Sequence, residues 1–214
     1  MSITIVVRRR ARPGQEEALL AGMLAVGAQR HSLLNPQVRV LQGLRDRRGL
    51  LYIGEWRSRE SYERSDQSGL AALAALSEGP PERWYLQQLD VRESSGERAQ
   101  AITATLVRAP PAATAAVIRL LLEEIGAAVC RSPGFLLRAL YQDLDDPGRL
   151  LALNGWRSAA DLLVTRRMLF ASFAAPLTRL GATSDLFEGD VRGTIDRAEP
   201  TGPPAIGPSP GTRP

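Results

Sequence analysis

The chain has no lysine, one histidine and one cysteine in 214 residues. All 27 of its basic residues are therefore arginines, which excludes Schiff-base chemistry because that chemistry requires a lysine amine. The single cysteine, Cys130, cannot form a disulfide within the chain. One histidine and one cysteine also cannot supply the usual ligands of a zinc site, so we expect no bound metal.

Motifs for nucleotide binding and for serine hydrolysis are missing as well. The chain contains no G-x-G-x-x-G fingerprint, no P-loop and no G-x-S-x-G elbow. A Ser-His-Asp triad would have to use His31, which we interpret instead as a residue that interacts with the dipole at a helix C-terminus. The sequence therefore gives no support to either class of enzyme.

The charge pattern argues against nucleic acid and membrane partners. The net charge is +4, but the arginines are spread along the chain and mixed with 23 acidic residues. The one basic cluster, residues 8–12, falls where a strand is expected to end, and we interpret it as a solvated loop. No apolar run is long enough to cross a membrane and no signal-peptide pattern is visible, so we expect a cytoplasmic protein.

What the sequence does contain is an internal repeat. The stretch LLYIGEWRS at residues 50–58 recurs as LLALNGWRS at residues 150–158. Each copy is typical of an apolar strand that ends at a tryptophan, with Ser58 or Ser158 as the N-cap of the next helix. Ile3-Thr4 matches Ile102-Thr103, and Asp90-Val91-Arg92 matches Asp190-Val191-Arg192. We predict two tandem units, 1–93 and 100–193, joined by a linker at 94–99 and followed by a disordered Pro/Gly-rich tail at 194–214.

Periodicity assigns the same order of elements to both units. The first unit should have strands at 2–8, 38–44, 50–56 and 84–92, and helices at 15–30, 58–66 and 69–77. The second should have strands at 101–108, 135–143, 149–156 and 184–192, and helices at 112–130 and 158–180. The β-α-β-β-α-β order predicts an α+β fold of two tandem ferredoxin-like units, whose antiparallel sheets pack together as an intrachain α+β barrel.

The strand that ends at each tryptophan carries the candidate site residues. Alternation places Tyr52, Gly54 and Trp56 on one face of the strand, toward the helices, and does the same for Asn154 and Trp156. Aromatic core packing and the lining of a ligand pocket are both compatible with this pattern. Glycine beside Trp56 leaves space for a ligand, and an asparagine on an apolar face must find partners if it is buried.

These motifs resemble those of the antibiotic biosynthesis monooxygenase family. The resemblance rests on Pro13-Gly14 before a long helix, on the strand end Glu55-Trp56-Arg57-Ser58, and on Tyr62 in the following helix. Members of this family are dimeric α+β barrels, so the chain resembles two such units fused together. A homodimer of the whole chain, through its outer surfaces, is compatible with this arrangement.

The resemblance implies residue roles. In the quinone-forming branch, Trp56 and Tyr62 would contribute to the substrate pocket, while Leu162 replaces the tyrosine in the second unit. The sequence departs from that branch where Tyr52 and Ala152 replace an asparagine and Gln42 and Gln142 replace a histidine. We predict Tyr62, Trp56 and Asn154 as catalytic residues and Tyr52, Gly54, Trp156 and Trp84 as substrate-binding residues. We predict that only one of the two pockets is catalytic and that it is the first, because Tyr62 can donate or accept a proton and Leu162 cannot. The rival prediction is that Asn154 marks the second pocket as the active one.

The implied function is an oxygenase of secondary metabolism. Its substrate would be a polycyclic aromatic polyketide, hydroxylated to a quinone or cleaved in the ring by O₂ without a metal. No bound cofactor is visible in the sequence, and reduced flavin as a diffusible co-substrate is compatible with it. The alternative is a non-oxidative protein on the same fold, either a polyketide cyclase-like helper or an aromatic-ligand-binding module.

Overall fold

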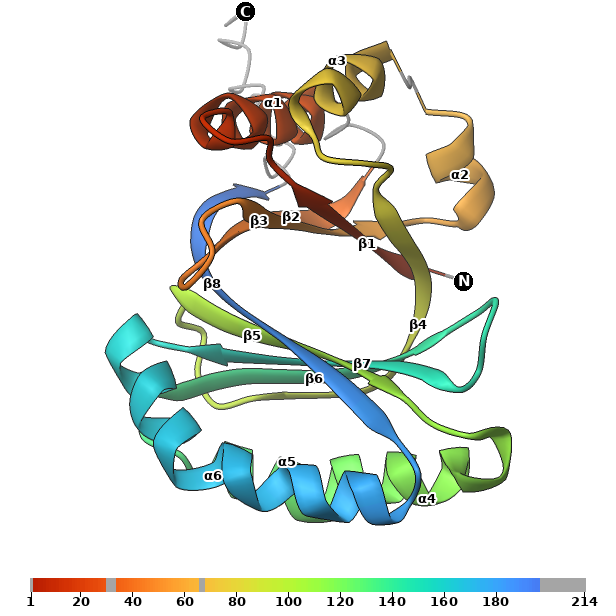
Figure 1. The fold of residues 1–214 in the computed structure, drawn as a ribbon, viewed down its shortest axis with the longest axis vertical. Helices are drawn as coiled ribbons and strands as arrows, with labels where there is room; N and C mark the ends of the chain where they lie inside the picture. Colours follow the sequence, from red (N-terminus) through yellow and green to blue (C-terminus); the bar gives the residue numbers. More distant parts are fainter. Residues whose placement is uncertain (1, 30–33, 66–67, 197–214) are drawn as a thin grey trace, which may run out of the picture.

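The computed structural model describes residues 2–29, 34–65 and 68–196 (Figure 1). His31 and residues 197–214 of the expected tail lie outside these ranges. The first unit contains β1 (Ile3–Arg10), α1 (Glu16–Gln29), β2 (Leu34–Gly43), β3 (Gly49–Trp56), α2 (Arg59–Glu63), α3 (Ser68–Leu76) and β4 (Glu82–Glu93). The second contains β5 (Ala101–Arg108), the 3₁₀ turn η2 (Pro111–Ala113), α4 (Thr114–Arg119), the π-helical turn η3 (Leu120–Ile125), α5 (Gly126–Cys130), β6 (Phe135–Asp143), β7 (Arg149–Trp156), α6 (Ala159–Arg179) and β8 (Thr183–Asp196).

The eight strands form one closed antiparallel barrel in the order β1-β3-β2-β8-β5-β7-β6-β4. Each unit contributes a sheet of ferredoxin-like order, β4-β1-β3-β2 or β8-β5-β7-β6, and the sheets join edge to edge where β2 pairs with β8 and β4 with β6. Pairing every edge within the chain leaves no open edge for association. The predicted fold class, an intrachain α+β barrel of two tandem ferredoxin-like units, is confirmed.

Two helical layers cover the outside of the barrel. In Figure 1, α1, α2 and α3 lie above the first sheet, and α4, α5 and α6 lie below the second. The apolar residues accordingly form three layers, because each strand buries one face against helices and the other inside the barrel. Val6, Leu51 and Ile53 pack inside the barrel with Ile102 and Leu153, whereas helix-facing residues pack in separate clusters on either side.

The register of the strands corrects the repeat alignment at β1 and β5. Ile3 pairs with Trp56 and Ala101 pairs with Trp156, so Ile3 is equivalent to Ala101 and not to Ile102. The one-residue difference moves Ile102 to the other face, inside the barrel. The Ile-Thr match in the sequence is therefore wrong as a structural equivalence.

The match between Asp90-Val91-Arg92 and Asp190-Val191-Arg192 is also wrong. Trp84 pairs with Val6, and Phe187 pairs with Ala104, which is the structural equivalent of Val6. The last strands are thus displaced by three residues from the sequence match. Both errors occur outside the Trp motif, where short identical runs arise by chance on strands of similar composition.

Three boundaries differ from the prediction. The helix expected at 112–130 is interrupted by the π-helical turn η3. Strand β2 begins before Val38 and contains Pro36 at an irregular register, a place where a strand tolerates proline. Strand β8 runs through Asp196, past its expected end at 192 and into residues 194–196 of the predicted tail, because it continues to pair with β2.

Candidate active site

The tryptophan motif has the geometry that the sequence predicts. Trp56 and Trp156 each end a strand, and Ser58 and Ser158 each cap the following helix by accepting a hydrogen bond from the backbone N–H three residues later. Alternation along β3 also holds, because Tyr52 and Trp56 pack toward α1 while their neighbours on the strand face the barrel interior. Each unit therefore has a helix–sheet layer in which a pocket can form.

The first unit fills this layer with aromatic rings. Trp56 and Tyr62 meet edge to face with centroids 4.9 Å apart, and Tyr62 meets Tyr85 at 6.1 Å. Trp56 is 0% exposed and Tyr62 is 2% exposed. The cavity lined by Tyr52 and Tyr62 measures only about 30 Å³, roughly the share of one water molecule in the liquid. As it stands, this layer is a packed core.

Gly54 leaves space that Tyr52 itself takes up. A Cβ atom added at Gly54 would lie 2.6 Å from the Tyr52 hydroxyl oxygen. The glycine therefore accommodates the neighbouring tyrosine ring in this structure, where the sequence suggested an approaching ligand. Gly54 and Tyr52 remain beside Trp56, as predicted, but with no room for an aromatic ligand between them.

Two arginines that were not predicted join the first-unit cluster. Arg9 and Arg83 line its small cavity, and the Arg83 Cζ lies 5.2 Å from the centroid of the Tyr62 ring. Burial, and next the charge of Arg83, lower the pKa of Arg9. Arg9 belongs to β1 and is buried, so the expectation of a solvated loop at residues 8–12 is wrong at this position.

The second unit has a larger cavity, of about 110 Å³, between its sheet and η3, α5 and α6. The lining residues are Thr105, Leu121, Ile125, Val129, Arg138, Ala152, Asn154, Phe173, Ala174, Leu177, Ser184 and Leu186. Ala152 stands at the position equivalent to Tyr52, as their pairing with β5 and β1 shows. The lost ring explains why a cavity exists here and is nearly absent in the first unit.

Polar groups enter this cavity from neighbouring strands. The Asn154 Nδ2 donates to the Thr103 Oγ1 at 3.3 Å. Arg138, which pairs with Asn154 in the register of β6 and β7, donates from Nη2 to the Leu121 carbonyl oxygen. Arg138 was not predicted from the sequence, although a signal existed: this arginine occupies a helix-facing strand position where the first unit has Val38.

The remaining predicted residues lie apart from the cavity. Trp156 is buried against Leu162, Ala101 and Val129, beside the cavity but not among its lining residues. Trp84 packs inside the barrel, on the face of the sheet opposite to Trp56. The structure thus brings Trp56, Tyr62, Tyr52 and Gly54 together, places Asn154 in the other unit, and separates Trp84 from both.

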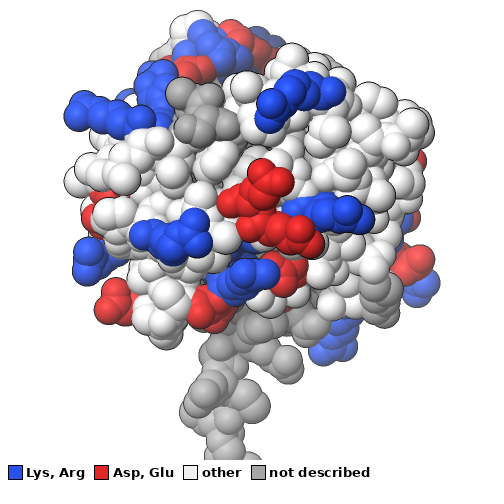
Figure 2. Space-filling view, turned by 90° about the horizontal axis from the view of Figure 1, so that it is seen from below, with Lys and Arg blue, Asp and Glu red and all other residues white. Residues whose placement is uncertain are grey.

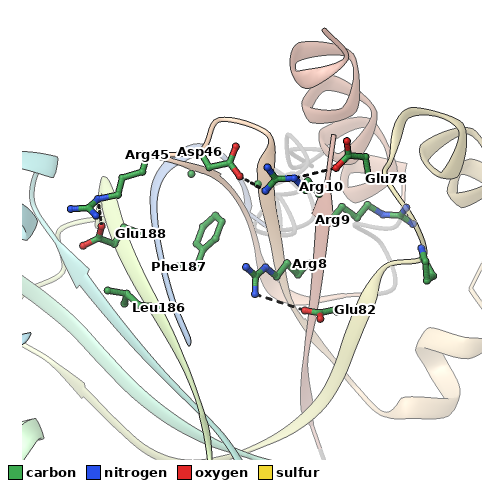
Figure 3. Close-up of a pocket in the computed structure, with 13 residues that line it drawn as sticks. Arg8, Arg9, Arg10, Arg45, Asp46, Glu78, Glu82, Leu186, Phe187 and Glu188 are labelled. Atoms are coloured by element: carbon green, nitrogen blue, oxygen red, sulfur yellow. Dashed lines mark hydrogen bonds and ion pairs between the residues drawn. The ribbon is translucent and has the colours of Figure 1, made fainter. Parts of the chain in front are cut away.

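A wider cleft of about 410 Å³ opens at the end of the barrel (Figure 3). Its charged side chains pair with one another: Arg8 with Glu82, Arg10 with Glu78, and Arg45 with Glu188. None of the predicted site residues lines it. Because its charges are already neutralised within the cleft, we place the candidate site in the helix–sheet layer.

Other classes of site find little support in the structure. Within residues 2–29, 34–65 and 68–196, no group of three or more His, Cys, Asp and Glu side chains could hold a metal ion. In the same part of the chain, no helix is long and apolar enough to cross a membrane. The face shown in Figure 2 carries basic and acidic side chains interspersed, without a continuous basic patch of the kind that binds nucleic acid.

The part of the chain that matches a known protein family lies in the second unit, which contains the larger cavity. Residues 101–166 match the family model described as antibiotic biosynthesis monooxygenase. The second unit is thus similar to an antibiotic biosynthesis monooxygenase. Thr103, Arg138, Asn154 and Trp156 all lie within the matched segment, and Phe173 of α6 lies beyond it. No curated protein sequence matches the chain.

Solved structures share the fold of the whole chain. An anthrone oxidase-like protein matches with a TM-score of 0.72 and 14% identity, covering 92% of this chain and 94% of that one. A proposed monooxygenase from Fusobacterium nucleatum matches with a TM-score of 0.71 and 11% identity, over 92% and 94%. A proposed monooxygenase from Lactobacillus acidophilus has a TM-score of 0.66 and 6% identity, over 92% and 96%. At these identities the likeness shows the fold alone.

Proposed function

We propose that the protein is an oxygenase that uses O₂ to oxidise an electron-rich aromatic compound in the second-unit cavity. The observation that carries the proposal is the cavity itself: an apolar space inside the unit that matches the monooxygenase family, with Asn154 and Arg138 entering from adjacent strands. The finer proposal is a polycyclic aromatic polyketide as substrate, hydroxylated to a quinone or cleaved in the ring.

The chemistry requires little from the protein. O₂ reacts slowly with closed-shell organic molecules because the reaction is spin-restricted, but a deprotonated phenol or anthrone can transfer one electron to O₂. Conversion of a ring CH₂ to C=O then consumes one O₂ and releases one water. The protein must supply an apolar pocket, a hydrogen bond to the developing enolate and a route for the proton. The Arg138 guanidinium can donate to an oxygen in the second-unit cavity, and the Asn154 amide can donate or accept there.

The size of the cavity restricts how a substrate binds. An enclosed cavity of about 150 Å³ can hold one benzene, so the second-unit cavity, at about 110 Å³, must widen somewhat to take even a single ring. A polycyclic substrate would place one ring in the cavity and require α6 to move outward for the rest. The half-buried Phe173 and the exposed Ala174 of α6 are the lining residues that such a movement would displace.

Oxygen uptake tests the proposal directly. We expect that anaerobic protein incubated with an anthrone gives no product, and that admission of air gives a quinone with one O₂ consumed for each substrate. Parallel incubations with and without reduced flavin test whether flavin acts as a diffusible co-substrate. If no incubation with any of several anthrones yields an O₂-dependent product, the oxygenase proposal fails for this substrate class.

Paired variants test which unit is active. Asn154→Leu removes a polar group from the second-unit cavity at similar volume, and Tyr62→Phe removes one hydroxyl from the first unit. We expect at least a tenfold lower turnover for Asn154→Leu, roughly 1.4 kcal/mol in the barrier, and little change for Tyr62→Phe. Thermal unfolding curves that match the curve of the wild type would show that both variants fold. The opposite result, with turnover lost only in Tyr62→Phe, would assign activity to the first unit.

One observation favours a second candidate, a non-oxidative aromatic-ligand-binding protein or cyclase-like helper. Among the residues that line the second-unit cavity, Arg138 is the only ionisable one, and an arginine stays protonated near neutral pH, so it does not act as an acid or a base. A site that binds but does not transfer protons fits this composition. Tight anaerobic binding of an aromatic ligand, together with no O₂ uptake under any condition above, would favour this function.

A further inference from the structure

Three polar side chains form a row across the second sheet. Thr103 on β5 pairs with Asn154 on β7, which pairs with Arg138 on β6, so all three share the helix-facing side. Their exposed fractions are 0%, 6% and 1%. The equivalent residues of the first unit are Ile5, Gly54 and Val38. The row is therefore specific to the unit that has the cavity, and it is not a requirement of the fold.

Asn154 contributes an unused acceptor to this row. Its Nδ2 donates to Thr103, and its Oδ1 has no hydrogen-bond partner within the described part of the chain. A buried acceptor without a partner lowers the stability of the folded protein, because it has lost its hydrogen bond to water. Such a group is retained at a cost in stability, which a ligand hydroxyl in the cavity would offset by donating to Oδ1.

Arg138 contributes an excess positive charge. Its Nη1 lies 3.7 Å from the Asp90 Oδ2, too far for a hydrogen bond, and the same carboxylate lies 3.3 Å from the Arg92 Nε. Two guanidinium groups thus share one carboxylate, so Asp90 does not fully neutralise Arg138. Among the described residues, Nη1 has no hydrogen-bond partner. An anionic ligand would neutralise the remaining charge.

The helix above the row is shaped to seat the guanidinium. A Cβ atom at Gly126 would lie 2.2 Å from the Arg138 Nη1, so the glycine leaves the space that the guanidinium occupies in this position. The Leu121 carbonyl that accepts from Nη2 belongs to the π-helical turn, a feature that is frequent at functional sites. The first unit has a regular helix α1 over its equivalent layer. Gly126 and the π-helical turn therefore both lie where they accommodate Arg138.

We infer that the second-unit cavity recognises its ligand as the mono-anion of a hydroxyaromatic ring that carries a second, adjacent hydroxyl. Arg138 Nη1 donates to the ionised oxygen, and Asn154 Oδ1 accepts from the neutral hydroxyl beside it. The inference deepens the proposed function and depends on it only for the choice of cavity. Arg138 thereby selects the ionised form, which is the form that can transfer an electron to O₂.

Anaerobic absorbance titration with 4-nitrocatechol tests this inference without any oxygen chemistry. The mono-anion of this single-ring probe absorbs in the visible, so the spectrum reports the ionisation of the bound ligand. We expect the bound probe to ionise at a lower pH than the free probe. The charged and titratable groups that face Arg138 are Asp90 and Arg92 on β4 and Cys130 on α5.

Two variants test separately the contact of Arg138 with the ionised oxygen and the contact of Asn154 with the neutral hydroxyl. Arg138→Met should weaken binding of the mono-anion at least about tenfold, roughly 1.4 kcal/mol, and abolish the shift in ionisation. Asn154→Leu should keep the shift but lose the preference for 4-nitrocatechol over 4-nitrophenol. Arg9→Met, which removes a buried guanidinium from the first-unit layer, is the matched control and should change neither.

Three results would overturn the inference. The first is that the wild-type protein binds neither probe, and the second is that the bound probe ionises at or above the pH of the free probe. The third is that Arg138→Met folds and binds the mono-anion as the wild type does. If Arg138→Met does not fold, two measurements still test the inference. They are the ionisation shift of the probe bound to the wild type and the loss of preference for 4-nitrocatechol in Asn154→Leu. An oxygenase assay that fails while these binding results hold would reject the proposed function and leave the recognition intact.

Discussion

Replacing Trp84 with alanine is expected to destabilise the protein by about 3–5 kcal/mol, the usual cost of removing a large aromatic side chain from a core. Trp84 is 4% exposed and packs inside the barrel with residues of both sheets, among them Val6, Leu86 and Ile102. Loss of the indole would leave a cavity between the sheets that the closed barrel cannot collapse to fill. Urea unfolding of the two proteins measures the difference.

The same variant separates a structural role for Trp84 from the predicted role in substrate binding. Ligand affinity in the second-unit cavity should be unchanged in Trp84→Ala at temperatures where it remains folded, because Trp84 lines neither helix–sheet cavity. Trp84→Phe, the conservative control, should lose less stability. A loss of ligand affinity without a comparable loss of stability would support the predicted role of Trp84 in substrate binding.

The alternation of apolar residues and the Trp motif were sufficient to predict the architecture. The β-α-β-β-α-β order follows from local periodicity, and the closed barrel follows because each sheet has two apolar faces and only one set of helices. The contact between Trp56 and Tyr62 follows from the capped turn at Ser58, which is encoded within a few residues. Local signals of this kind need no knowledge of distant contacts.

Features that depend on distant contacts were not predicted. The displacement of the last strands depends on pairing across the seams β2–β8 and β4–β6, which short sequence matches do not report. The burial of Arg9 and Arg138 contradicts the usual exposure of arginine. It depends on hydrogen-bond acceptors from other elements, the Ser77 hydroxyl for Arg9 and the Leu121 carbonyl for Arg138. The volume beside Gly54 depends on the rotamer of Tyr52, which periodicity cannot indicate.

The two units have diverged in opposite directions within one fold. In the first, Tyr52, Tyr62 and Tyr85 fill the helix–sheet layer, and its cavity shrinks to about 30 Å³. In the second, Ala152 leaves the layer open and Asn154 adds a polar group. A chain with one substrate needs one productive site, so the other unit is free to become a packed core. The polar row then gives a physical reason to expect the activity in the second unit.

Separating the units should abolish the folded monomer. A fragment of residues 1–93 would lose the pairing of β2 with β8 and of β4 with β6, and it would expose Val6, Leu51 and Trp84 to water. Two unpaired edges beside an exposed apolar face favour self-association. We therefore expect the fragment either to remain unfolded or to form a dimer that rebuilds the barrel from two copies, as judged by circular dichroism and by light scattering after size-exclusion chromatography. The intact chain is the control, because its barrel closes without a second copy, so any homodimer it forms must use outer surfaces. A monomeric fragment with cooperative unfolding would contradict this, since it would mean that one sheet is stable with its barrel face exposed to water.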